Sequence, residues 1–508
     1  MNFISLTFII FFFILLLLYQ IVPSAIRWKV LLLGSFVFYL WAGWEKLLFV
    51  LVTAGIAFVV GKRIDWIYAG KKKQDELKKK KARGYLIIGI VLILLQLFYA
   101  KLGQDIAALF QANAGDAVKT IVPLGISYYT LSIIGYLCDV YWQKDKAESV
   151  YFRLLLYMIY FPAILQGPIH RHQNLSKQLY QGYPIEYGAL CFGLQRMVWG
   201  FFKKMVIADR FAVITSEIFK LYHFYSGQYF VVAVLSSAIQ LYCDFSGCMD
   251  IALGASECFG ISLDENFRRP FFSRSSAEFW RRWHITLGAW FRDYVYMPMV
   301  ASPLLAGIGR QIKKWFGARA GKNAMMAIPI AVVWLLTGLW HGTGLDYIIW
   351  GIYWGVIIIV ASLFAAQLKK PLKLMHIDEK SEGWAIFERF RTFLIFCGGR
   401  LLTAPGDLKI SLIALKSMFT EFNIWIWFDG SLNNLGLDRK NLCVGIIAVL
   451  ILCVVEHKQE KGIEIRKRIA DMPVFFRWSI YYGAIAAVLL FGMYGSGNVG
   501  NGFIYMKY

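Results

Sequence analysis

The sequence carries little charge for its length. Charged residues make up 17% of its 508 residues and hydrophobic residues make up 58%, whereas about 25% of the residues in an average globular protein are charged. The mean hydropathy is +0.54, and the apolar residues are gathered into long runs. This composition excludes a disordered chain, a disulfide-rich miniprotein and an ordinary soluble enzyme. We therefore expect an integral membrane protein that crosses the bilayer several times.

Patterns that would bind a metal are also scarce. The sequence has eight cysteines, and none of them forms a Cys-x-x-Cys pair, so neither a zinc site nor a disulfide framework is indicated. Of the seven histidines, His170 and His172 are two positions apart, but no third ligand accompanies them. We expect no bound metal and no bound cofactor.

Acidic residues are outnumbered by basic ones, 32 to 54, which gives a formal net charge of +22. In a soluble protein this excess would suggest binding to nucleic acid. In a membrane protein, however, Lys and Arg gather in cytoplasmic loops and face anionic lipid. We therefore expect membrane lipid, and not nucleic acid, to be the partner of these residues.

The long apolar runs predict an all-α fold with roughly 11–14 membrane helices, because about 20 apolar residues cross a hydrocarbon core ~30 Å thick. The first run, 1–22, is longer than the apolar part of a signal peptide and is predicted to be an anchor. Two segments, 245–262 and 283–300, are interrupted by Gly, Asp or Arg and are expected to be tilted, re-entrant or interfacial. The other predicted spans are 30–43, 46–61, 85–100, 121–141, 151–169, 188–208, 229–243, 325–341, 345–366, 386–403, 441–456 and 474–493.

The charge of the loops predicts an orientation. The stretches 71–83, 309–322 and 456–477 are rich in Lys and Arg and are expected in the cytoplasm. Three predicted spans precede the first of these stretches, which places the N-terminus outside. One span follows the last of them, which places the tail, 494–508, outside as well.

Two histidines lie in settings where an imidazole could do chemistry. His341 ends one predicted span just before another begins, and His284 follows a run of Trp and Arg. Imidazole titrates near neutral pH and is the usual general base, so either residue could deprotonate a hydroxyl for attack on a thioester. Taken alone, either residue is more often structural than catalytic. Gly338 and Gly342 favour a site at His341, because they allow close backbone approach or a break in the helix.

Several motifs around these histidines resemble those of the membrane-bound O-acyltransferases (MBOAT). The resemblance is to the branch that contains the alginate O-acetylation and teichoic-acid D-alanylation proteins. It extends from roughly 30 to 360 and is weaker toward the C-terminus. The most specific block is 240–298, with Gln-Leu-Tyr-Cys-Asp-Phe-Ser-Gly at 240–247 and Trp-Arg-Arg-Trp-His at 280–284. Further similar motifs are Leu-Trp-His-Gly at 339–342, 122–129 and 161–169.

The resemblance implies the MBOAT fold, in which helices surround a central tunnel, as a single membrane domain over 1–508. Its motif-bearing core covers about 30–360, with additional membrane helices over 386–493 and an extracellular tail over 494–508. His341 is then the catalytic histidine and His284 a second functional histidine.

The resemblance also implies the substrates and partners of such an enzyme. The donor is acyl-CoA or an acyl carrier protein in the cytosol, and the acceptor is an extracellular polysaccharide or cell-envelope polymer. An extracellular or membrane-anchored acyltransferase is the expected partner. The expected location is the plasma membrane of a bacterium, crossed many times.

The last residues of the sequence are similar to the Phe-x-Tyr-x-x-Phe ending found in this branch or its small partner proteins. Here Phe503 and Tyr505 match, whereas the last position is Tyr508 and not Phe. The hypothesis is that Tyr505 accepts the acyl group outside and passes it to the partner. The alternative is that this aromatic tail is an anchor at the membrane interface.

Five arginines in fifteen residues are candidates for donor binding, because guanidinium groups bind phosphate in a bidentate manner. The alternative is a cytoplasmic face near anionic lipid, and Asp244 is expected to pair with one of them. The five are Arg268, Arg269, Arg274, Arg281 and Arg282.

Two other functions compete with acetyl transfer to a polysaccharide. One is D-alanyl transfer to teichoic acid, although the length of the chain and its acceptor-like tail favour polysaccharide O-acetylation. The other is a transporter or polysaccharide-export component, because intramembrane His, Asp and Arg also mark ion pathways. Transporters commonly show repeated halves, and no internal repeat is visible in this sequence.

Overall fold

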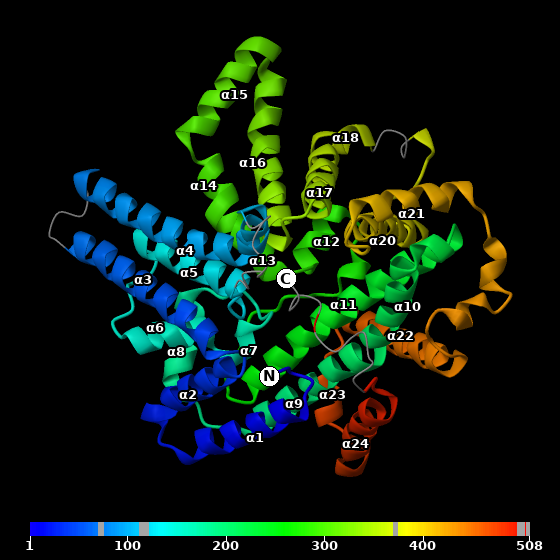
Figure 1. The fold of residues 1–508 in the computed structure, drawn as a ribbon, viewed down its shortest axis with the longest axis horizontal. Helices are drawn as coiled ribbons and strands as arrows, with labels where there is room; N and C mark the ends of the chain where they lie inside the picture. Colours follow the sequence, from blue (N-terminus) through cyan, green and yellow to red (C-terminus); the bar gives the residue numbers. More distant parts are fainter. Residues whose placement is uncertain (70–75, 111–120, 369–373, 495–502, 504–508) are drawn as a thin grey trace. The chain divides into compact units, whose positions relative to one another are not determined.

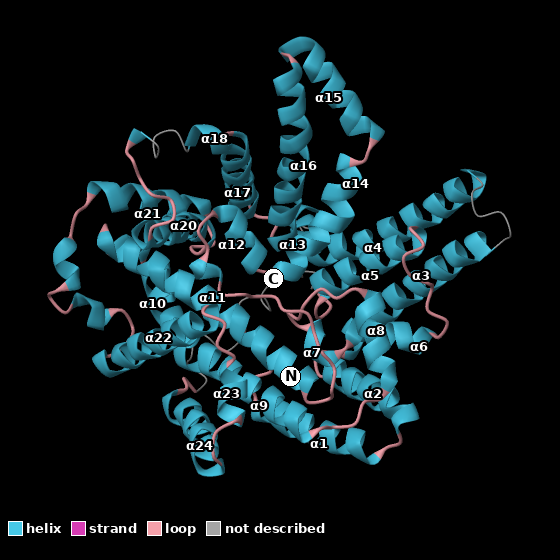
Figure 2. Ribbon diagram, turned by 180° about the vertical axis from the view of Figure 1, so that it is seen from behind, coloured by secondary structure: helices cyan, strands magenta, loops and turns pink. Residues whose placement is uncertain are grey.

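The structure is a computed structural model, and it describes residues 1–69, 76–110, 121–368, 374–494 and 503. In this part of the chain every regular element is a helix, and the only β-type pairing is an isolated antiparallel bridge between Phe267 and Trp283. Figures 1 and 2 show the helices and the loops that join them. The predicted all-α fold is therefore confirmed.

Seven helices among the described residues are long and apolar enough to cross a membrane. This confirms a multi-pass membrane protein. Helix α1 (Leu6–Ile21) is apolar but shorter. The predicted total of roughly 11–14 membrane helices requires that shorter helices also cross the membrane, and that total stays a prediction. The seven are α3 (Trp44–Ala69), α4 (Glu76–Phe110), α11 (Gln228–Glu257), α16 (Ala318–His341), α17 (Leu345–Leu363), α22 (Arg439–Glu460) and α24 (Val474–Phe491).

The prediction that 229–243 and 245–262 are separate segments is wrong, because α11 covers the first and continues without a break into the second as far as Glu257. The acid that interrupts the apolar run, Asp244, accepts a hydrogen bond from Lys204 and so does not end the helix. Gly254 lies where a Cβ would be 2.4 Å from the carbonyl oxygen of Gly193. A glycine at this position serves close helix packing rather than a turn.

Two other predicted spans are divided. Residues 151–169 form α6 (Tyr151–Ile159) and α7 (Phe161–Ile164). Pro162 occupies the first turn of α7, where its missing N–H is not needed. Residues 188–208 form α9 (Tyr187–Phe201), which continues directly as the π-helix η2 (Phe202–Ala208).

The described residues divide into two compact units. The first contains Met1–Gly200 and Cys248–Asp264. In it α3, α4 and α5 pack against one another, and α2 packs against α6. Phenylalanines from three helices form part of its core, among them Phe8, Phe38 and Phe161. Its remaining helices are α2 (Arg27–Leu40), α5 (Ile126–Tyr141) and α8 (His172–Gln181).

The second unit contains Phe201–Gly247 and Glu265–Ile504. Its helix α16 packs between α15 and α17, α17 packs against α20, and η2 contacts both α22 and α24. His284 and His341 both belong to this unit. That residues 1–508 form a single membrane domain stays a prediction. The other helices of this unit are α10 (Asp209–Lys220), α12 (Ser276–Arg282), α13 (Ile285–Phe291), α14 (Met297–Val300), α15 (Pro303–Phe316), α18 (Ala365–Leu368), α20 (Glu382–Thr403), α21 (Leu408–Thr420) and α23 (Ile465–Ala470).

Candidate active site

His284 stands at the sharp turn between α12 and α13. Its backbone is in the left-handed region, with φ at 47°, a conformation that costs a non-glycine residue roughly 1–2 kcal/mol. The chain can turn here because the bridge between Phe267 and Trp283 fixes the residue before it. Strain of this kind persists where the surroundings hold it and is concentrated at functional sites. The side chain of His284 is buried.

Asn266 holds this turn with a single side-chain oxygen. Its Oδ1 accepts hydrogen bonds from the backbone N–H of Thr286 at 3.1 Å and from the Thr286 hydroxyl at 3.0 Å. The same oxygen lies 3.2 Å from Nδ1 of His284. Because a backbone N–H can only donate, this atom must be the amide oxygen, and the Nδ1 of His284 must carry the proton. The lone pair of the neutral imidazole is therefore on Nε2.

His341 has the same tautomer for a different reason. It is the last residue of α16, and its Nδ1 lies 2.7 Å from the carbonyl oxygen of Thr337, one turn earlier. A carbonyl oxygen can only accept, so Nδ1 carries the proton and Nε2 the lone pair. The side chain of His341 is partly exposed, whereas that of His284 is buried.

The two imidazoles are brought together around one indole ring. The ring of Trp340 lies 6.0 Å from that of His284 and 4.8 Å from that of His341, nearly edge-on to both. His284 is in none of the seven candidate spans. Burial first, and then the charge of His341, lower its pKa well below the ordinary value. His284 is therefore neutral at physiological pH.

Glycines let α16 and α17 approach closely enough to place His341. A Cβ on Gly338 would lie 2.5 Å from the carbonyl oxygen of Tyr347, and one on Gly351 would lie 2.6 Å from that of Trp334. A Cβ on Gly342 would lie 2.3 Å from the ring of Tyr347. The structure thus explains the glycines on both sides of His341 by close packing.

Aromatic side chains surround the partly exposed histidine. The ring of Trp350 lies 5.0 Å from that of His341, and Trp350 also contacts Trp280 and Trp334. Apolar surroundings of this kind lower the local dielectric and strengthen the electrostatic interactions of a polar group.

Three of the five candidate arginines are already bound to carboxylates. Glu460, at the end of α22, accepts from Nε of Arg269 at 2.6 Å and from Arg282 at 2.8 Å. Arg282 also pairs with Glu278 on its own helix at 2.7 Å. These contacts fix the arginine-rich segment to α22, so we infer that Arg269 and Arg282 act mainly in structure.

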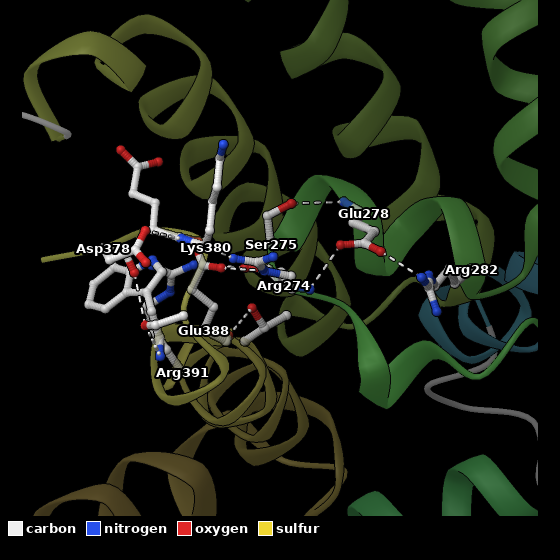
Figure 3. Close-up of polar contacts among 12 residues, drawn as sticks. Arg274, Ser275, Glu278, Arg282, Asp378, Lys380, Glu388 and Arg391 are labelled. Atoms are coloured by element: carbon white, nitrogen blue, oxygen red, sulfur yellow. Dashed lines mark hydrogen bonds and ion pairs between the residues drawn. The ribbon is translucent and has the colours of Figure 1, made fainter. Parts of the chain in front are cut away.

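Arg274 fixes the same segment to α20 (Figure 3). Its Nε donates to Glu388 at 2.6 Å, and its guanidinium also reaches the carbonyl oxygen of Glu379. In return Arg391 donates to the carbonyl oxygen of Arg274 at 2.9 Å. The structure therefore leaves Arg268 and Arg281, whose side chains are exposed, as the members of the group best placed to meet a ligand from solution.

The sequence did not single out every polar residue near this site. Asn266 lies in a quoted motif, but its bond to His284 spans 18 positions and no spacing rule reveals it. Lys204 lies in an apolar run and binds Asp244, which was expected to pair with an arginine. Tyr505 lies outside the described residues.

Comparison with known proteins identifies the family. The family model of the membrane-bound O-acyltransferases matches residues 143–312. The probable alginate O-acetylase of Pseudomonas aeruginosa is 30% identical over 457 residues, which cover 87% of this chain and 78% of that protein. This chain belongs to the membrane-bound O-acyltransferase family.

Other similar proteins differ in the acyl group that their names give. The peptidoglycan O-acetyltransferase of Helicobacter pylori is 29% identical over 281 residues, half of each chain. The teichoic acid D-alanyltransferase of Bacillus subtilis is 32% identical over 251 residues, 49% of this chain and 60% of that protein. The protein is therefore a membrane O-acyltransferase, and the comparisons favour acyl transfer over transport or export.

Proposed function

We propose that this protein transfers an acetyl group from a cytosolic thioester toward a hydroxyl of an extracellular polysaccharide, in the plasma membrane of a bacterium. The observation that carries the proposal is the matched pair of imidazoles. Both His284 and His341 have the proton on Nδ1 and the lone pair on Nε2, and both contact Trp340.

The reaction needs one base and one leaving thiol. A histidine Nε2 takes the proton of the acceptor hydroxyl as its oxygen attacks the thioester carbonyl carbon. The C–S bond then breaks, the thiolate takes up the proton, and an ester and a thiol are the products. A positioned base contributes about 10²–10⁴ to the rate of such a step.

We assign the proton transfer to His341 and a supporting role to His284. His341 is partly exposed and can meet a substrate, whereas His284 is buried and strained in a turn that Asn266 holds. The lowered pKa keeps His284 neutral, so its Nε2 can accept a hydrogen bond rather than hold the proton.

The donor in this proposal is acyl-CoA or an acyl carrier protein, and it approaches from the cytoplasm. Both donors are anionic. Arg268 and Arg281 are exposed and can bind a phosphate or an acidic surface, while Arg269, Arg274 and Arg282 shape the segment that presents them. The basic stretches 309–322 and 456–477 support the same orientation, with both termini outside.

In our proposal Tyr505 accepts the acyl group on the outer side of the membrane. It then passes the group to an extracellular or membrane-anchored acyltransferase. A phenol has a pKa of about 10, so it requires a base such as His341. The burial of Phe503, two positions earlier, supports a tail that is held by the protein rather than dissolved in lipid.

D-alanyl transfer is the second candidate, because relatives named teichoic acid D-alanyltransferase match about half of this chain or more. The comparisons with O-acetylases cover more of it, 87% in the case of the Pseudomonas aeruginosa protein. A panel of donors separates the two candidates, since each acyl group changes the mass of the product by a different amount.

The test uses purified protein in lipid nanodiscs, incubated with labelled acetyl-CoA, acetyl carrier protein or D-alanyl carrier protein. Transfer to the protein's tail and to added polysaccharide is followed by mass spectrometry. We expect His341→Ala to reduce transfer at least ~10²-fold while the variant still inserts and folds. His223→Ala is the matched control, because His223 is an exposed histidine on a short helix elsewhere in the same unit.

Unchanged transfer in His341→Ala would contradict the proposed role of the histidine. Transfer of D-alanyl but not of acetyl would favour the second candidate. If a Tyr505→Phe variant still modified polysaccharide at the normal rate, Tyr505 would not belong to the pathway.

A further inference from the structure

Lys204 is a buried cation that the acyl-transfer chemistry above does not use. It lies in the π-helix η2, and its Nζ is 2.6 Å from Asp244 and 2.8 Å from Asp209. The three side chains are 1–3% exposed. We call these residues the Lys204 cluster.

Such a cluster is not explained by stability alone. Removing one cation and two carboxylates from water is expensive, and a buried ion pair is often no more stabilising than apolar residues of similar volume. π-Helices are rare and frequently occur at functional sites. We therefore expect a partner group that interacts favourably with a fixed, poorly hydrated cation.

Phe503 is that partner in the structure. Its ring centroid is 5.0 Å from Nζ of Lys204, and the side chain is fully buried. A cation within about 6 Å of an aromatic face is attracted by the ring quadrupole, and the attraction is strongest when both groups are removed from water.

The chain that leads to Phe503 is attached to the same π-helix at a second point. Helix α24 contacts η2, and just after this helix the backbone N–H of Met493 donates to the carbonyl oxygen of Met205 at 3.0 Å. Met493 thus binds Met205, the residue next to Lys204, and Phe503 contacts Lys204 itself. Both contacts hold the chain beyond α24 against the same part of η2.

One turn of α11 joins the Lys204 cluster to the histidine site. Asp244 binds Lys204, and the next residue, Phe245, meets the ring of His284 edge-on at 4.9 Å. The residue after that, Ser246, accepts a hydrogen bond from Lys203 at 2.9 Å. A side chain bound at Lys204 is therefore linked, through Asp244, to the helix that also contacts His284.

We infer that the Lys204 cluster is a binding site for an aromatic side chain, that Phe503 occupies it, and that this contact positions the residues after Phe503 for acyl transfer. Phe503 and Lys204 are positioning residues in this scheme. The existence of the site stands on the contacts alone, and its purpose rests on the proposed function.

Cross-linking tests the contact directly. We would place the photoreactive residue p-benzoyl-phenylalanine at position 503 of the full-length protein in nanodiscs. We expect cross-links to peptides from η2 and from the middle of α11. The same residue at position 494, where Tyr494 is exposed, is the matched control and should label lipid instead. Cross-links from position 503 to lipid would overturn the site.

Graded substitution tests the purpose. Phe503→Leu keeps an apolar side chain without an aromatic face, and fluorinated phenylalanines weaken the face stepwise at nearly constant shape. We expect kcat for acylation of the tail to fall with each step, by about tenfold in Phe503→Leu. The KM for the donor should stay the same, and Phe503→Trp should restore kcat. An unchanged kcat throughout the series would overturn the positioning role.

Lys204→Met is a poor first variant, because it would leave two buried carboxylates without their cation and could unfold the protein. The Phe503 series avoids this problem. His341→Ala, measured in parallel, separates the two claims. Normal transfer in that variant overturns the proposed function, whereas the cross-linking result decides the aromatic site independently.

Discussion

The side-chain oxygen of Asn266 accepts from both donors of Thr286 and lies 3.2 Å from Nδ1 of His284. One atom therefore fixes the turn, the orientation of the ring and the position of its proton. Where a histidine takes part in catalysis, the group that fixes its orientation and tautomer is typically worth about 10–100-fold in activity.

Replacing Asn266 should separate these effects. Asn266→Ala removes the acceptor, so we expect a loss of ~10²-fold in kcat/KM and a less stable turn. Asn266→Asp keeps the acceptor but adds a negative charge, which raises the pKa of His284. The acid limb of the pH profile of kcat/KM should then move to higher pH.

The control for this pair is Asn174→Ala, at an exposed position on α8. If Asn266→Ala retained normal activity with an unchanged pH profile, the orienting role of Asn266 would be wrong. A profile that did not move in Asn266→Asp would show that His284 does not set the acid limb.

Burial of His284 also predicts a dependence of stability on pH. Its pKa is well below the ordinary value in the folded protein, whereas in the unfolded chain it is about 6.5. Below that pH the unfolded chain binds a proton that the folded protein does not, so stability falls as pH falls. His284→Asn can still donate to Asn266 but does not titrate. Its Tm should decline less than that of the wild type between pH 7.5 and 5.0.

Thermal unfolding in detergent at constant ionic strength measures this difference. The slope that His284 contributes can approach about 1.4 kcal/mol per pH unit below its unfolded pKa. His223→Asn should behave like the wild type, since His223 is exposed. Parallel curves for wild type and His284→Asn would mean that His284 titrates normally in the fold.

Much of the fold could be predicted from the sequence because apolar runs of sufficient length have few alternatives to a membrane helix. The prediction failed where polar residues inside a run have partners elsewhere. The sequence predicts a break in α11 at Asp244 and the glycines. In the structure, Lys204 binds Asp244 and Gly254 allows close helix packing, so the helix continues. A hydropathy pattern contains no information on such pairing.

The candidate histidines were found from residue type and motif, but their supporting contacts were not. Asn266 and His284 are 18 positions apart, and the contact between Lys204 and Phe503 joins residues that are far apart in the sequence. Such contacts depend on tertiary packing. Burial and paired carboxylates also reduced the five arginines to two with exposed side chains, which the sequence could not do.

Those two arginines provide a third prediction. Arg268→Ala and Arg281→Ala together should raise the KM for the donor by about tenfold, because a charge-assisted contact to phosphate or carboxylate is lost. Neither change should alter kcat or Tm much, since both side chains are exposed. Arg269→Ala should instead lower Tm, because it leaves Glu460 with one cation fewer.

Steady-state kinetics with varied donor concentration distinguishes these outcomes. Arg319→Ala, at an exposed basic position in the first turn of α16, is the matched control for net charge. A donor KM that rose equally in the control would indicate a general electrostatic effect rather than a site at Arg268 and Arg281.

The last prediction concerns the spacing of α16 and α17. In Gly338→Ala the new Cβ would lie 2.5 Å from the carbonyl oxygen of Tyr347 and 3.3 Å from the Cα of Gly351. The contact is with backbone, which cannot move aside, so the helices must separate. We expect a loss of about 1–3 kcal/mol in stability and at least tenfold lower activity, because His341 lies less than one turn further along α16.

Gly483→Ala is the matched control, because Gly483 is also inside an apolar helix but has open space around its Cβ position. There the substitution should be neutral or stabilising by roughly 0.5–1 kcal/mol, since alanine favours helix more than glycine does. Comparing activity at a temperature where both variants are fully folded isolates the displacement of His341 from general instability. Normal activity in Gly338→Ala under those conditions would show that acyl transfer tolerates a shift of that histidine, and the site would have to be reassigned.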